Sequence, residues 1–189
     1  MRDTPERFSP LTIALHWLVG LTIIALLSVG WYMAEYDAYG LYPLHKSTGI
    51  LVLSLVLVRV WWRLSNGWPA PASQYRAWEQ ALARVVHWVL IIGMVLMPLS
   101  GMLMSGAGGH GLDLYGLQLL AANPDPSNPG QVIALNETAA ELGHETHEVL
   151  GTVLMVAVLL HVAGALKHHL IDKDGTLRRM LGARITPGQ

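Results

Sequence analysis

Histidine is the residue type in this sequence whose placement could do chemistry. The chain has nine histidines and no cysteine. Five of the histidines lie within or at the ends of long apolar stretches, where an ionisable side chain is costly and is functional by default. Four of them have small neighbours at helical spacing, namely His16, His45, His147 and His161, and the fifth is His87. Imidazole binds iron, zinc and copper, whereas the lack of cysteine excludes iron–sulfur clusters, thiolate-bound zinc, covalently attached haem and disulfides. The four histidines are therefore the candidate metal ligands.

The spacing of the last two candidates predicts how the four are paired. His147 and His161 are 14 residues apart, and in a helix this separation rises about 21 Å and returns to within roughly 40° of the same face. One helix thus presents two imidazoles near opposite sides of a membrane. Topology then pairs His147 with His45 on the outer side and His161 with His16 on the inner side. Two pairs at two depths are what two bis-histidine haems require.

Small residues flank these histidines at helical spacing. A glycine follows three of them at position i+4, on the same helix face. These glycines are Gly20, Gly49 and Gly151. A glycine at that position leaves clearance for a flat macrocycle beside the imidazole, and His161 has alanines one turn away on both sides. His87 has the bulky Ile91 at i+4, which argues against His87 as a ligand.

Other interpretations of the histidines stay open. Any one intramembrane histidine is as well explained by a hydrogen bond to a neighbouring helix, and small residues four apart are common in membrane helix packing. A haemless metal-binding or transport protein is a further alternative. Such proteins add carboxylates or thiols within their spans, whereas no acidic residue lies at mid-membrane here. The acidic residues at or beyond the outer edge are Glu35, Asp37, Glu141, Glu145 and Glu148. The set of four with matched depth therefore favours haem.

The elements that must position these residues are membrane helices. The chain is 52% hydrophobic and only 13% charged, and a span needs roughly 20 mostly apolar residues. Four windows qualify, at residues 11–33, 44–62, 85–104 and 147–166. We expect the first helix to start with Ser9 as N-cap and Pro10 in its first turn, and the fourth to begin earlier, near Asn136. The predicted fold is all-α, one integral membrane four-helix bundle over residues 1–189.

The basic residues predict the orientation. Eleven of the 12 Lys and Arg residues lie in the N-terminal tail, around the connection between the second and third spans, or after the fourth span, and Lys46 is the exception. Residues 105–143 contain neither. The positive-inside rule then places both termini in the cytoplasm. The connection 64–84 is expected on the cytoplasmic surface, and 105–143 outside as irregular turns. Arg59, Arg63 and Arg84 are interpreted as inner-side anchors, with contact to a propionate or a quinone as the alternative.

Several segments around these histidines form a recognisable set. They are Ala14–Leu18, Leu44–Ile50, Val58–Arg63, His147–Glu148 and the tail from Leu160 to Leu177. On these segments the chain resembles the bacterial cytochrome b561 family over nearly its whole length. The resemblance implies four helices that hold two haems b. It also implies His16 and His161 as the iron ligands of the inner haem, and His45 and His147 as those of the outer haem.

The resemblance also implies a function. It suggests a dihaem cytochrome of the bacterial inner membrane that exchanges electrons with the quinone pool, and one member of the family looks like a superoxide oxidase that reduces quinone. We therefore expect electron transfer across the membrane with a quinone as partner and an unidentified donor. A superoxide:quinone oxidoreductase is the specific enzyme considered, and a non-enzymatic cytochrome b subunit serving a periplasmic redox partner is the alternative. The absence of Lys and Arg from residues 105–143 disfavours an anionic substrate on that side.

Overall fold

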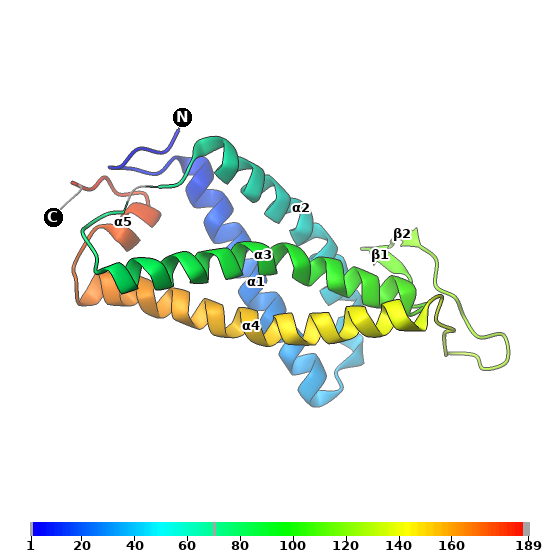
Figure 1. The fold of residues 1–189 in the computed structure, drawn as a ribbon. Coiled ribbons are helices and arrows are strands. Elements are labelled where there is room, and N and C mark those ends of the chain that lie inside the picture. Colours follow the sequence, from blue (N-terminus) through cyan, green and yellow to red (C-terminus); the bar gives the residue numbers. More distant parts are fainter. Residues whose placement is uncertain (1, 70, 187–189) are drawn as a thin grey trace.

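Four long helices make up most of the chain (Figure 1). The computed structural model describes residues 2–69 and 71–186. The long helices are α1 (Pro10–Tyr36), α2 (Tyr42–Asn66), α3 (Ala77–Ala107) and α4 (Glu137–Leu170). The short elements are η1 (Tyr39–Leu41), β1 (Leu112–Leu114), β2 (Leu117–Leu120) and α5 (Thr176–Met180). Each long helix is long and apolar enough to cross a membrane. The prediction of an all-α membrane bundle is confirmed.

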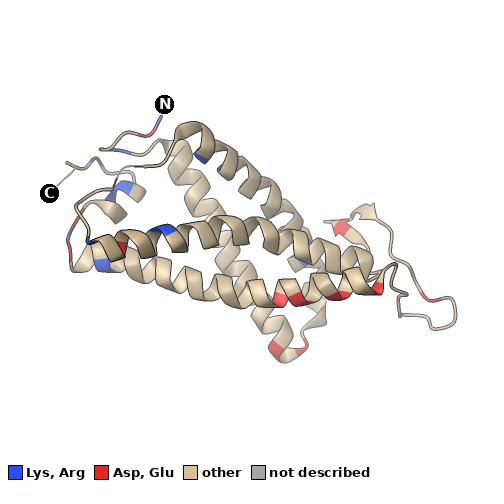
Figure 2. Cartoon of the chain, in the orientation of Figure 1, with Lys and Arg blue, Asp and Glu red and all other residues tan. Residues whose placement is uncertain are grey.

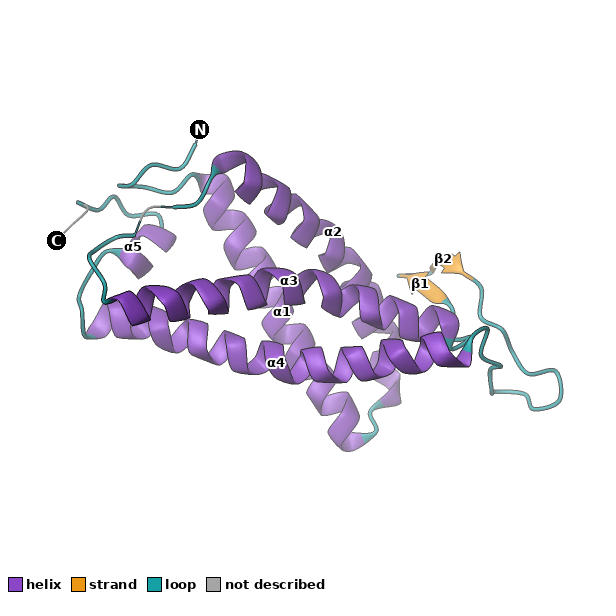
Figure 3. Cartoon of the chain, viewed as in Figure 1, coloured by secondary structure: helices purple, strands orange, loops and turns teal. Residues whose placement is uncertain are grey.

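The helices pack as a chain of neighbours. α3 and α4 lie side by side along their lengths, α1 packs on α2, and α2 packs on α3 (Figure 1). α1 and α4 approach each other at few points. Both ends of the described chain and α5 lie at one end of the bundle, and the two strands lie at the other (Figure 3).

Local sequence signals set the helix starts. Ser9 caps α1, with its hydroxyl accepting a hydrogen bond from the Thr12 backbone N–H, and Pro10 occupies the first turn, as predicted. The Asn136 side chain caps α4 in the same way by accepting from the backbone N–H of Ala139, so the predicted early start of the fourth helix is also correct. α3 begins at Ala77, eight residues before the predicted apolar window. The window missed these first two turns because they mix polar with apolar residues.

The segment between α3 and α4 is more ordered than expected. We predicted irregular turns over residues 105–143, and the structure instead includes a two-stranded antiparallel hairpin, β1 with β2. Tyr115 and Gly116 form its two-residue turn, and both have positive φ, as a type I′ turn requires. The Ser47 hydroxyl of α2 donates to the Asp113 carbonyl and accepts from the Tyr115 N–H. The hairpin therefore rests on the start of α2.

Close helix contact occurs where side chains are absent. A Cβ added to Gly143 of α4 would lie 2.5 Å from the Met104 backbone nitrogen of α3, and one added to Gly93 of α3 would lie 2.6 Å from Leu154. Small residues allow this kind of backbone approach in membranes. A cluster of buried apolar residues fills the middle of the bundle. Its members are Val19, Ile23, Val52, Val56 and Met94.

The two ends of the bundle differ in charge. Lys and Arg gather at the end that holds the termini, whereas Asp and Glu dominate the other end, on the first turns of α4 and at the turn after α1 (Figure 2). By the positive-inside rule this asymmetry favours a cytoplasmic position for the end that holds the termini, here called the inner end.

The C-terminal segment is tied to the inner end by a polar network. Asp174 is buried and accepts hydrogen bonds from the Tyr75 hydroxyl and the Thr176 backbone N–H. Lys167 forms ion pairs with Glu79 and Asp172. Burial raises the pKa of Tyr75 to about 12, so its hydroxyl remains a hydrogen-bond donor at neutral pH. This network holds the connection before α3 against the end of α4.

The close packing of α3 on α4 leads to a stability prediction. Gly143→Ala should lower the free energy of unfolding by about 1–3 kcal/mol, the usual cost of overpacking, because the new methyl group would meet backbone atoms of Met104. The measurement is the midpoint of thermal unfolding in detergent, followed by circular dichroism. Gly40→Ala is the matched control, since its Cβ would meet nothing within 4 Å. An unchanged midpoint for Gly143→Ala would contradict the packing described.

Candidate metal centre

Two pairs of imidazoles lie inside the bundle, each shared between two helices. The rings of His16 on α1 and His161 on α4 have centroids 6.0 Å apart, at an interplanar angle of 54°. The rings of His45 on α2 and His147 on α4 are 6.2 Å apart, at 81°. The structure thus brings together the same partners that the 14-residue spacing on α4 predicted. One pair lies towards the inner end and the other lies beneath the hairpin.

The separation of the rings leaves room for one metal ion in each pair. An imidazole nitrogen binds a first-row metal at about 2.0–2.1 Å. Two rings on opposite sides of one ion therefore have centroids about 6 Å apart, whereas a direct nitrogen–nitrogen hydrogen bond would bring them to about 5 Å. The observed 6.0 and 6.2 Å match the first arrangement. Both separations therefore leave room for one iron between the two rings.

Hydrogen bonds orient the His147 ring for this role. Its Nδ1 lies 3.0 Å from the Met97 carbonyl oxygen and 3.1 Å from the Ser100 hydroxyl, both on α3. Donation from Nδ1 to the carbonyl places the proton on that nitrogen and leaves the Nε2 lone pair available to a metal. Partners of this kind typically fix the tautomer of a metal-binding histidine.

One ring nitrogen of His45 makes no hydrogen bond within the described residues. This atom, Nδ1, is buried and has no hydrogen-bond partner among the described residues, which is uncommon for a buried polar atom. A Cβ on Gly30 would lie 3.3 Å from the edge of this ring, and one on Gly101 would lie 2.9 Å from the His147 ring. These two glycines therefore make space for the imidazoles themselves.

The glycines expected to clear a macrocycle border open space in two cases of three. A Cβ added to Gly20 or Gly49 would meet nothing within 4 Å, while one added to Gly151 would meet the Met97 methyl at 3.5 Å. Space beside His16 and His45 is what a flat group bound to those rings needs. The clearance role of the three glycines stays a prediction.

A third imidazole lies at the inner pair. The His87 ring is 5.2 Å from the His161 ring, edge to face, and its Nδ1 is 2.7 Å from the carbonyl of Ala83, one turn earlier in α3. The 5.2 Å separation is shorter than the spacing across one metal ion. This position fits a residue that lines the site better than it fits an axial ligand.

The three inner-side arginines have different surroundings. Arg63 forms an ion pair with Asp3 at 3.4 Å, as an anchor at the membrane surface would. Arg59 instead reaches the inner pair, where its guanidinium nitrogen lies 3.0 Å from His16 Nδ1. Arg84 lies at one end of a groove on the outside of the bundle.

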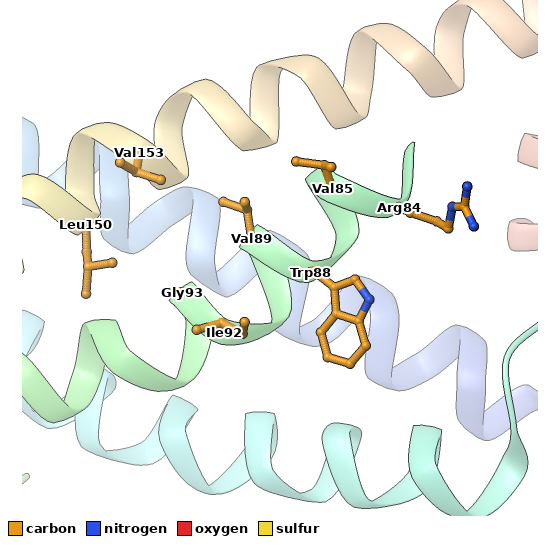
Figure 4. Close-up of a pocket in the computed structure, with 8 residues that line it drawn as sticks. All are labelled: Arg84, Val85, Trp88, Val89, Ile92, Gly93, Leu150 and Val153. Carbon is orange, nitrogen blue, oxygen red and sulfur yellow. The ribbon is translucent and has the colours of Figure 1, made fainter. Parts of the chain in front are cut away.

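This groove, of about 510 Å³, runs between α3 and α4 (Figure 4). Apart from Arg84 its lining is apolar. The lining residues are Arg84, Val85, Trp88, Val89, Ile92, Gly93, Leu150 and Val153. Arg84 and His87 are three residues apart on α3 and are therefore neighbours on its surface, so the groove ends close to the inner histidines.

Sequence reasoning missed several residues of the site. Gly30 and Gly101 offered a signal, because glycine is unfavourable inside a helix and each lies in an apolar span without an obvious reason. Met97 and Ser100 offered none, because their contact with His147 depends on the register between α3 and α4.

Comparison with known proteins finds relatives over nearly the whole chain. A family model described as prokaryotic cytochrome b561 matches residues 7–183. Cytochrome b561 homolog 2 of Escherichia coli K12 is 32% identical over 185 residues, which cover 95% of this chain and 94% of that protein. Cytochrome b561 homolog 1 of the same organism is 30% identical over 184 residues, covering 95% and 99%. A probable superoxide oxidase CybB of Yersinia pestis is 26% identical over 183 residues, covering 93% and 96%.

The family match extends over all four long helices and both histidine pairs. It implies a bacterial membrane protein of electron transport that binds b-type haem, in agreement with four membrane-length helices and paired intramembrane imidazoles. The chain belongs to the prokaryotic cytochrome b561 family.

Proposed function

We propose that the chain holds two b-type haems and carries electrons across the bacterial inner membrane between an extracytoplasmic donor and a quinone. The inner haem would be held by His16 and His161, and the outer one by His45 and His147. The observation that carries the proposal is the presence of two imidazole pairs with metal-spanning separations of 6.0 and 6.2 Å. α4 supplies one ring to each pair.

The side chains around the two pairs suit electron transfer. A haem held between two histidines would supply a one-electron couple. His147 and His161 are separated by about 21 Å along α4, which sets the two pairs at two depths. The apolar cluster of Val19, Val52 and Met94 fills the middle of the bundle and excludes water there, and low polarity around a metal site tunes its potential.

The groove between α3 and α4 is our candidate for the quinone site. A quinone has an apolar chain and carbonyl acceptors. The groove offers an apolar lining with Arg84 at one end. The Arg84 side chain points away from the other lining residues, and its Nε donates to the Gln80 carbonyl (Figure 4), so the guanidinium, a donor-only group, would turn towards the groove to donate to a quinone carbonyl. His87 lies one turn from Arg84 and 5.2 Å from the His161 ring. A quinone headgroup at that end would lie near the inner pair.

The electron donor distinguishes the two forms of this function, a superoxide:quinone oxidoreductase and a cytochrome that serves a periplasmic redox partner. A relative is named a probable superoxide oxidase, which supports superoxide as donor. The outer end of this chain argues against it, because residues 105–143 carry no Lys or Arg and a cationic funnel would be expected for an anion. We favour a cytochrome that serves a periplasmic redox partner. Quinone reduction by the purified protein with superoxide alone would instead establish the enzyme.

The ligand assignment predicts the haem content of four variants. We expect about two haems b per wild-type chain and about one in each of His16→Ala, His45→Ala, His147→Ala and His161→Ala, because each substitution removes one ligand of one pair. Pyridine haemochrome quantitation and reduced-minus-oxidised spectra measure this. His144→Ala, an exposed histidine on the same helix as His147, is the control and should keep both. Full haem retention in the four variants would refute the assignment.

The open space at Gly20 predicts a selective loss. Gly20→Leu should keep the helical fold, since the added atoms begin in a volume with nothing within 4 Å, yet it should lose the inner haem because that volume is needed by the macrocycle. Circular dichroism reports the fold and the haemochrome assay reports the haem. Leu21→Phe adds bulk at an exposed position of the same helix and should keep both haems. Equal haem content in the two variants would exclude a clearance role for Gly20.

Filling the groove should impair quinone reduction alone. Ile92→Trp is expected to raise the half-saturation concentration of a soluble quinone analogue roughly tenfold, the scale of effect for one misfit group in an apolar site, with unchanged haem content. Protein reduced with stoichiometric dithionite is mixed with the analogue by stopped flow, and the rate of haem re-oxidation against analogue concentration gives the half-saturation concentration. Leu159→Trp, at an exposed position of α4 outside the groove lining, is the control. A half-saturation concentration equal to wild type for Ile92→Trp would move the quinone site elsewhere.

A further inference from the structure

Arg59 is a cation without a counter-ion in the described structure. It lies in α2, seven residues before that helix ends at Asn66. Its guanidinium is partly buried, with His16 Nδ1 at 3.0 Å and Met94 Sδ at 4.0 Å. Neither partner is an anion, and within residues 2–69 and 71–186 none of the ion pairs includes Arg59. An uncompensated charge inside a membrane segment is costly and usually marks function.

Arg63, one turn further along α2, shows what an ordinary anchor looks like. Its guanidinium pairs with Asp3 and also donates to the Gly67 carbonyl. Asp3 is already engaged by Ser9, Thr12 and Arg63. Asp3 is thus committed, and Arg59 faces the inner histidine pair instead.

The contact between Arg59 and His16 conflicts with a ligand role for His16. Guanidinium is only a donor, so His16 Nδ1 accepts from Arg59 only when the imidazole proton is on Nε2. A neutral histidine that binds iron through Nε2 carries its proton on Nδ1. Two donors would then face each other at 3.0 Å. Arg59 must therefore exchange His16 for another acceptor when His16 becomes a ligand.

A b-type haem brings such an acceptor, because its macrocycle carries two propionate carboxylates. Arginine matches a carboxylate in both charge and geometry. We propose that Arg59 is the counter-ion that recognises a carboxylate of the macrocycle held between His16 and His161, and that it leaves the His16 ring when that group binds. This inference rests on the proposed function. It makes Arg59 a determinant of which macrocycle enters the inner site.

The test compares haem with its dimethyl ester, which lacks the two carboxylates. The full chain carrying His45→Ala, so that the inner pair alone is intact, is produced without haem and titrated in detergent with each compound. We expect the chain to prefer the free acid. Arg59→Gln should weaken binding of the free acid about 10- to 100-fold, the scale found for groups that support metal ligands. It should leave binding of the diester nearly unchanged, and Arg59→Lys should recover part of the preference.

Arg63→Gln is the control and should keep the wild-type preference, since Arg63 has its own anion. The reduction potential gives a second readout. It should fall in Arg59→Gln, because loss of a nearby cation disfavours the reduced state. If Arg59→Gln binds the free acid as tightly as the chain with Arg59 intact, or if its potential is unchanged or higher, the role of Arg59 is overturned while the ligand assignment stands. A chain that takes up no haem would overturn the proposed function and this inference with it.

Discussion

Two kinds of contact around α4 organise the bundle, a close one with α3 and a wider one with α1 and α2 at the two histidine pairs. Two imidazoles on either side of one metal ion need about 6 Å between ring centroids, with flat clearance around them. α4 meets both demands. It packs tightly on α3, where glycines replace side chains, and it faces α1 and α2 across the two histidine pairs. Small residues therefore serve opposite purposes here. Gly143 closes a contact, while Gly20 and Gly49 border open space.

Most of the fold follows from local signals in the sequence. Apolar windows of about twenty residues predicted the helices, and Ser9 and Asn136 predicted two of the starts, because capping depends on a few adjacent residues. The hairpin was missed for the opposite reason. β1 and β2 have three and four residues, too few for a period-2 pattern, and their position depends on Ser47, 66 residues away from Asp113 in the chain.

The same distinction between local signals and long-range contacts applies to the site. The pairing of the histidines was predictable, because a fixed rise per residue on α4 converts sequence spacing into depth. The ligand roles themselves stay predictions. Contacts that cross between helices, such as Met97 with His147 and Arg59 with His16, depend on rotation and register that no single helix encodes. The paired histidines of such a protein can therefore be predicted from sequence more readily than the residues that orient them.

The few contacts between α1 and α4 have a consequence for the life of the protein in the cell. Those helices meet at few points, and His16 and His161 face each other across that seam. A ligand that binds only the folded state stabilises it by mass action. Proteases cut segments that open, so a bound group that bridges this seam would make the chain more resistant to proteolysis.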